Sequence, residues 1–422
     1  MTVDTRIPNV FDAALGAIAY HDLSHPDEAH REIKRAREQA PVALSQYGVE
    51  VLSYDLVRTV LRDPRFVIPK GIGLAAQGIT SGPVWDRVCR LLISVDGDQH
   101  RRLRHLVARA FTPRAAERMR SACVEVITEL VERHVAAGRC DVVTDIARPY
   151  PVAIICALIG APRRDWHLFS GWADDISKAF GLNVAEETPA ILRAWTQLEA
   201  YIEMLIAERR HHLSDDLLSE LIRAEDAGDR LSHDELVNLV AILLNAGTDT
   251  TRNQLAAAVH VLMDHPDQWA LLATHPDLAP RAVEELIRHT PIVLTALRQA
   301  GEDVCLGGVV FPAGSLVVAN TASANRDLAV FHDPERVDIT RDAPAALLSF
   351  GGGVHYCLGA HLARVELVEA LRVITSRIRC PHRSGPVPWK PVSGIGGPVT
   401  LPIEFVTQCC AINPFVHSQE GE

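Results

Sequence analysis

The sequence predicts a mainly α-helical protein with a minor β-sheet region, folded as one large domain. Three observations support this class. Apolar residues recur at helical spacing over long segments, whereas alternating strand-like segments are few and short. No internal repeat, low-complexity tract or linker divides the 422 residues. Hydrophobic residues make up 48% of the chain, which is enough for a large core and excludes a disordered protein.

The predicted helices are bounded by capping residues and prolines. Thr112-Pro113 marks one start, Ser232 and Glu235 have capping-box spacing at another, and Pro291 ends a third. A looser connection over 181–188 separates two of the helices. The expected helical ranges are 115–137, 163–180, 189–212, 232–263, 267–273, 278–290 and 358–374.

Strands are expected at 48–53, 304–310, 315–320 and 401–406. The turn residues Pro312-Ala313-Gly314 favour a β-hairpin between the second and third of these. Residues 331–350 have no clear period and are expected to form a structured loop. We therefore expect a domain over 41–406, an N-terminal segment 1–40 packed on it, and a C-terminal tail 407–422 that carries Cys409 and Cys410.

Charge and cysteine content narrow the class of partner. The formal net charge is −11, which argues against a nucleic-acid-binding protein. The nine cysteines have no regular spacing and no CxxC pair, so a disulfide framework or a structural zinc site is not expected. No secretory leader is visible, and the apolar stretches near 151–161 and 236–244 are shorter than a membrane span of about 20 residues. We expect a cytoplasmic protein with no membrane insertion.

The most informative stretch is 350–359, which is FGGGVHYCLG. Three consecutive glycines allow positive φ and a close approach to a flat partner. Because a helix is expected to start just after Cys357, free amides and the helix dipole there should lower the pKa of the thiol and favour a thiolate that can ligate iron. The alternative interpretation is a buried structural cysteine after a tight turn.

A second stretch, AGTDTT at 246–251, lies in the middle of a predicted apolar helix. Glycine costs about 1 kcal/mol relative to alanine there, and threonine hydroxyls can bond back to carbonyls and bend the helix. The result would be a local opening, where Asp249 and Thr250 could pass protons to bound dioxygen. The alternative is a kink with a solvated carboxylate. Asn245, just before this run, could face a ligand or bond within the fold.

Two pairs of charged residues share helix faces. Glu285 and Arg288 are three residues apart, and His100 and Arg104 are four apart. Cations that face a pocket suit carboxylates. Taken separately, each pair could equally be a solvent-exposed surface feature.

The 350–359 stretch resembles the haem-binding signature of the cytochrome P450 family: an aromatic residue, Gly-x-Gly, a basic residue two before the cysteine, and then Leu-Gly. The 246–251 run resembles the oxygen-activating motif of that family, and the similarity extends from about residue 41 to 405. This resemblance implies a cytochrome P450 fold and a haem-dependent monooxygenase. It also implies haem b (iron protoporphyrin IX) with Cys357 as the axial metal ligand.

The resemblance further implies roles for particular residues. It assigns Thr250 to hydrogen bonding with dioxygen and Asp249 to relaying protons from solvent. His100, Arg104, Arg298 and His355 would bind the haem propionates. The expected cofactor-binding residues are His100, Arg104, Ala246, Gly247, Arg298, Phe350, Gly351, His355, Cys357 and Gly359. A structural network is expected to comprise Glu285, Arg288 and Arg336, and the substrate pocket to include Val240, Asn245, Ile292, Val293, Leu294 and Ile395. Val337 departs from the aromatic residue usual in the family.

The implied reaction inserts one oxygen atom from dioxygen into an apolar small molecule such as a terpenoid, steroid, fatty acid or natural-product scaffold, by hydroxylation or epoxidation. No flavin or nicotinamide motif is present, so electrons would come from a separate ferredoxin and ferredoxin reductase. A basic run that includes Arg101, Arg102, Arg109 and Arg114 could steer such an acidic partner. The alternatives are a peroxide-driven haem-thiolate enzyme, a non-catalytic haem-binding sensor, and a cofactor-free helical protein with coincidental motifs.

Overall fold

The fold is described from a computed structural model. It describes residues 7–20, 23, 25–181, 183–228, 231–342, 345–392 and 394–406. The predicted tail 407–422, with Cys409 and Cys410, lies outside the described residues. Helices dominate the described chain, which confirms the predicted class.

The α-helices are α1 (Pro26–Gln39), α2 (Tyr54–Val60), α3 (Pro83–Arg90), α4 (Gly97–Ala108), α5 (Pro113–Arg118), α6 (Arg120–Val135), α7 (Pro149–Ile159), α8 (Trp166–Ser177), α9 (Val184–His211), α10 (Leu217–Asp226), α11 (His233–Asp264), α12 (Pro266–Thr274), α13 (Ala279–His289), α14 (Thr321–Ala324) and α15 (Ala360–Arg377). A π-helical turn, η4 (Val142–Ala147), precedes α7.

The strands are β1 (Ala17–Ile18), β2 (Val42–Ser45), β3 (Gly48–Val51), β4 (Phe66–Val67), β5 (Arg139–Asp141), β6 (Ala296–Ala300), β7 (Val304–Leu306), β8 (Val309–Phe311), β9 (Leu316–Ala319), β10 (Arg379–Arg383) and β11 (Pro402–Val406). Within the described residues they form a sheet in the order β1-β2-β3-β9-β6-β4, a smaller sheet β10-β11-β5, and the hairpin β7-β8.

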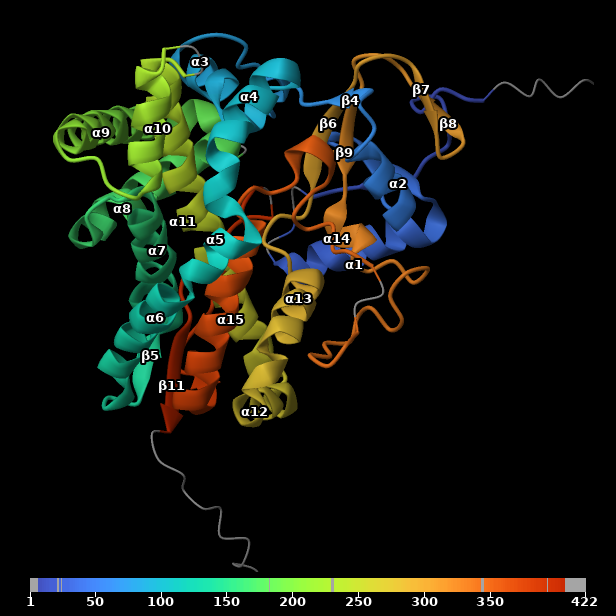
Figure 1. Ribbon diagram of the computed structural model, residues 1–422. Helices are drawn as coiled ribbons and strands as arrows, with labels where there is room; N and C mark the ends of the chain where they lie inside the picture. Colours follow the sequence, from blue (N-terminus) through green and yellow to red (C-terminus); the bar gives the residue numbers. More distant parts are fainter. Residues whose placement is uncertain are drawn as a thin grey trace, which may run out of the picture.

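The long helix α11 runs through the middle of the helical part, with α7, α8, α9 and α10 packed around it (Figure 1). The larger sheet lies on the other side of the molecule, together with α1, α2 and α14 (Figure 1). A main hydrophobic core joins α6, α7, α11 and α15, and a smaller cluster forms around α1 and the adjoining strands. Helix α11 is therefore the central support for the residues near its midpoint.

Several predicted helices agree closely with the structure. The capping box of Ser232 and Glu235 is present, and α11 ends at Asp264, within one residue of the predicted end. Two of the predicted helices were wrong in detail. The range 115–137 is two helices, because the chain tightens at Met119, whose amide bonds to Ala116 three residues earlier at 3.0 Å.

The second wrong boundary is the start of α9. The sequence placed it at Pro189, but the helix begins at Val184 and includes the proline. Val184 is fully buried, and its amide donates to the side chain of Gln77 at 3.3 Å. Tertiary packing thus outweighs the hydrogen bond that Pro189 cannot donate.

The predicted hairpin between 304–310 and 315–320 was also wrong. Strand β7 turns back at Gly307 and Gly308, which have φ of 62° and 81°, and pairs with β8. Two glycines with positive φ favour this tight turn over the Pro312-Ala313-Gly314 segment. Strand β9 instead enters the larger sheet between β3 and β6, where Val317 lies opposite Arg298.

One described segment, Val142–Ile159, is long and apolar enough by composition to cross a membrane. It comprises the π-helical turn and α7, so the apolar stretch is longer than the sequence suggested. However, 72% of it is buried within the fold, and α7 packs against α6, α8 and α11. Its apolar composition is explained by its place in the core.

Candidate functional site

The loop before α15 is held by its own backbone. The amide of Cys357 donates to the carbonyl of Phe350 at 2.8 Å, which closes the loop. Gly351 and Gly353 have positive φ of 72° and 64°. At Gly353 an added Cβ would lie 2.5 Å from the carbonyl oxygen of Leu61, whereas at Gly351 no atom lies closer than 3.8 Å. Of these two glycines, Gly353 is required by its close contact with Leu61, whereas the position beside Gly351 has room for a Cβ atom.

Cys357 lies three residues before α15. The amides of Gly359 and Ala360 and the guanidinium groups of Arg104 and Arg364 act to lower the pKa of its thiol. Burial is the larger effect, and the net pKa is raised. The amides therefore act in the predicted direction, but burial outweighs them and the predicted net lowering of the pKa is not found. Protein atoms surround the thiol on most sides, yet the residue keeps exposed surface and so borders space that protein atoms leave open.

Two histidines predicted to bind a cofactor lie together. The rings of His100 and His355 are 4.2 Å apart between centroids, and His355 Nε2 lies 2.5 Å from Oδ1 of Asp96. Burial, followed by the charges of His355 and Arg104, lowers the pKa of His100 to about 4. Asp96, which sequence reasoning missed, also accepts a hydrogen bond from the amide of Ile68 at 2.7 Å.

Two arginines lack carboxylate partners. Arg298 on β6 is buried, and its guanidinium donates to the carbonyl of Leu297 at 2.9 Å. Arg104 on α4 donates to the carbonyl of Tyr356, the residue before the cysteine, at 2.6 Å. Neither forms an ion pair with a carboxylate among the described residues. A buried cation without a counter-ion is costly, so this donor set fits a ligand that brings its own carboxylates, as a porphyrin does.

The middle of α11 contains an accessible strip. Ala246 is exposed, and Gly247 and Thr250 are partly exposed, although most residues of this helix are buried. The Thr250 hydroxyl donates to the carbonyl of Ala246 at 2.8 Å. An added Cβ at Gly247 would lie 2.9 Å from Ile155 of α7, so this glycine also permits close packing of two helices.

Asp249 is not a solvated carboxylate. Only 2% of its side chain is exposed, and it contacts Arg252, Asn253 at 2.8 Å and Lys390 at 3.4 Å. Burial alone would raise the pKa of Asp249, but the charges of Arg252 and Lys390 hold it below its usual value. Arg252 also pairs with Asp174 of α8 at 2.6 Å. The alternative of a kink with a solvated carboxylate is therefore wrong.

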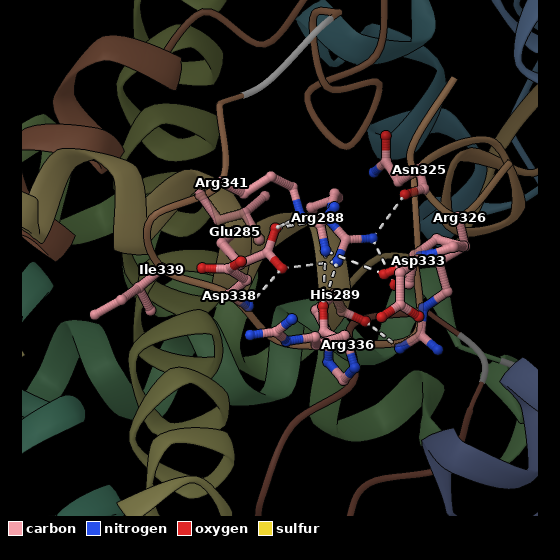
Figure 2. A network of polar contacts seen from close by, with 12 residues as sticks. Glu285, Arg288, His289, Asn325, Arg326, Asp333, Arg336, Asp338, Ile339 and Arg341 are labelled. Atoms are coloured by element: carbon pink, nitrogen blue, oxygen red, sulfur yellow. Dashed lines mark hydrogen bonds and ion pairs between the residues drawn. The ribbon is translucent and has the colours of Figure 1, made fainter. Parts of the chain in front are cut away.

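The predicted charge network of Glu285 and Arg288 is present, but its third side chain is not that of Arg336 (Figure 2). Arg288 binds Glu285 through two hydrogen bonds of 2.7 and 2.9 Å, and both side chains are buried. Arg336 takes part through its backbone carbonyl, which accepts from Arg288 at 3.3 Å. The second basic side chain on Glu285 is that of Arg341, at 3.0 Å. An arginine at 341 has no local pattern that would have identified it.

The predicted substrate-pocket residues divide into two groups. The segments that carry Ile292 and Ile395 are joined by a hydrogen bond from the amide of Gly396 to the carbonyl of Ile292, 2.7 Å long. Val293 and Ile395 are partly exposed, and Leu294 is nearly buried. Val240, by contrast, is fully buried in the main core, so the structure gives it no accessible surface.

Comparisons with known proteins agree with this geometry. A family model described as Cytochrome P450 matches residues 173–273 and 275–380. Mycinamicin IV hydroxylase/epoxidase of Micromonospora griseorubida is 42% identical over 367 residues, which cover 85% of this chain and 90% of the relative. Cytochrome P450 monooxygenase PikC of Streptomyces venezuelae is 36% identical over 414 residues, or 95% of both chains.

Solved structures give the same result. The structure of CalO2 has a TM-score of 0.85 and 30% identity, and the match covers 90% of this chain and 96% of that chain. Epothilone B-bound cytochrome P450epoK has a TM-score of 0.83 with 29% identity and the same coverage. The chain therefore belongs to the cytochrome P450 family and is an oxygen-incorporating oxidoreductase of the monooxygenase type.

Proposed function

We propose that the protein is a haem b monooxygenase that hydroxylates or epoxidises an apolar small molecule, with electrons from a separate ferredoxin and ferredoxin reductase. The observation that carries the proposal is the exposed residue Cys357 together with Arg104 and Arg298, which form no ion pair with a carboxylate among the residues that the structure describes. When bound, the haem supplies oxygen activation: one atom of dioxygen enters the substrate and the other leaves as water.

In this proposal Cys357 would bind the haem iron through its thiolate, and two arginines and two histidines would bind the haem carboxylates: His100, Arg104, Arg298 and His355. Ala246, Gly247, Phe350, Gly351 and Gly359 are each at least partly exposed and would border the haem. Asp96 would orient His355 through the contact of 2.5 Å.

Proton supply is assigned to Thr250 and Asp249. The Thr250 hydroxyl must leave the carbonyl of Ala246, 2.8 Å away, before it can donate to a ligand. Asp249 has almost no contact with solvent, so protons must reach it through its partners. Lys390 is the partner best placed for this, because its side chain is 30% exposed and also contacts Asp249 at 3.4 Å.

The substrate class follows from the apolar pocket residues and from the relatives. The names of three relatives describe a hydroxylase/epoxidase, an N-oxygenase and an epoxidase. We infer an apolar natural-product scaffold of medium size, bordered by Ile292, Val293, Leu294 and Ile395 and by Asn245.

For the electron donor, the four arginines expected to steer it are Arg101, Arg102, Arg109 and Arg114. Arg101 is paired with Asp98 and Arg102 with Glu235. Arg109 and Arg114 are exposed and form no ion pair within the described part of the chain. These two are therefore the better candidates for steering an acidic ferredoxin in the cytoplasm.

The test is product formation from a natural-product panel with NAD(P)H, a surrogate ferredoxin and its reductase. We expect turnover that exceeds the rate with hydrogen peroxide alone, because the Asp249–Thr250 pair is intact. Replacing Thr250 with Ala should preserve haem binding and divert electrons to peroxide. Faster turnover with peroxide, or tight coupling in that variant, would favour the peroxide-driven alternative; haem binding without any turnover would favour a sensor.

A further inference from the structure

We infer that the side-chain amide of Asn245 is a polar anchor for the substrate, and that the substrate therefore carries a hydroxyl group on its apolar scaffold. The inference rests on the proposed monooxygenase function and adds a property of the substrate to it. Its basis is a buried side-chain oxygen that has no hydrogen-bond partner among the described residues.

Asn245 lies on α11 and is only 6% exposed. Its Oδ1 atom is buried and has no hydrogen-bond partner among the residues that the structure describes. If the oxygen and nitrogen of the amide exchanged places, the nitrogen would occupy this position and would lack a partner in the same way. An amide removed from water and left unbonded lowers stability, so its presence calls for a partner outside the described fold.

Other polar side chains of the same helix are satisfied locally. Thr248 donates to a carbonyl one turn earlier at 2.7 Å. Asn253 donates to the backbone and carboxylate oxygens of Asp249 at 2.6 and 2.8 Å. Gln254 donates to the carbonyl that follows α13 at 3.1 Å. Asn245 thus differs from Asn253, which has the same side chain about two turns further along and whose amide nitrogen donates two hydrogen bonds within the fold.

The position of Asn245 indicates which partner it serves. It directly precedes Ala246, the exposed residue of the accessible strip, and it lies one turn before Asp249. It is therefore next to the open part of α11 in the chain and one helical turn from the buried charge cluster, on the helix that carries the proposed proton donor. A substrate hydroxyl bonded here would satisfy the amide and fix the orientation of an otherwise apolar scaffold.

The first test compares the thermal stability of two isosteric replacements in the haem-loaded protein without substrate. Asn245→Leu should leave the melting temperature unchanged or raise it, because no internal bond is lost. Asn253→Leu is the matched control and should lower it by at least about 2 °C. A decrease for Asn245→Leu as large as that of the control would show that the amide bonds within the fold, and would overturn the inference.

The second test measures binding of cyclododecanol and cyclododecane by the spin-state absorbance shift of the haem. The wild type should bind the alcohol more tightly than the hydrocarbon, and Asn245→Leu should reduce that preference about tenfold, the equivalent of one buried hydrogen bond. No preference in the wild type, or a preference that survives the replacement, would overturn the inference. The carbon-monoxide spectrum of both proteins checks haem-thiolate binding separately, so failure of the proposed function would be visible on its own.

Discussion

Two arginines of one loop, Arg341 and Arg336, provide a matched test of the charge network in Figure 2. Arg341 is largely buried, with its Nε atom 3.0 Å from Glu285. Its remaining donors reach the carbonyls of His332 at 2.6 Å, Asp333 at 3.1 Å and Arg336 at 3.0 Å. The side chain of Arg336 is exposed and forms no ion pair with the described residues.

The expected magnitudes follow from these contacts. A hydrogen bond to a charged group contributes about 1.5–3 kcal/mol, and the three carbonyls would be only partly rehydrated. Replacing Arg341 with Ala should therefore lower the free energy of unfolding by about 2–4 kcal/mol. Replacing Arg336 with Ala should change it by less than about 0.5 kcal/mol, because its backbone carbonyl remains.

The assay is urea unfolding of the haem-loaded protein at pH 7.5, followed by circular dichroism, with both variants and the wild type in one series. An equal loss of stability in the two variants would refute the assignment of Arg341 as the second basic side chain on Glu285. A greater loss of stability on replacing Arg336 would instead support the sequence prediction, in which the side chain of Arg336 is the third part of the network.

Two further predictions concern pH and backbone conformation. Burial, with the charges of Arg326 and Arg288, lowers the pKa of His289 to about 2. Below a pH of about 6.5 the unfolded state therefore binds a proton that the folded state does not bind. The free energy of unfolding then decreases as the pH falls, by up to about 1.4 kcal/mol per pH unit. His289→Gln should flatten this slope in unfolding measured between pH 6.5 and 5, and an unchanged slope would contradict the effect. Replacement by Ala should cost at least about 1 kcal/mol more at Gly353 than at Gly351 in the same unfolding assay, since only the former meets a backbone oxygen, at 2.5 Å; equal costs would contradict that packing.

Local signals in the sequence predicted the features that depend on neighbouring residues. The capping box at Ser232 fixed the start of α11, and the glycine-rich loop located Cys357 before α15. Such features depend on hydrogen bonds over a few residues, which spacing alone can indicate.

Features that depend on distant residues could not be predicted in the same way. Lys390 reaches Asp249 from 141 positions along the chain, and Arg341 reaches Glu285 from 56 positions away. The raised pKa of the Cys357 thiol has the same origin, because the local amides favour the thiolate while burial by the whole fold opposes it. A sequence pattern can indicate the effect of the local amides, but it does not indicate how deeply distant parts of the chain bury the thiol.

The ligand at the iron is the feature on which the proposed chemistry depends, and the reduced carbon-monoxide complex reports it directly. The haem-loaded wild type should show a thiolate-type Soret band, and the Cys357→Ala variant should lack it. A thiolate-type band that persists in the variant, or a wild type that binds no haem when supplied with it, would contradict the assignment of Cys357.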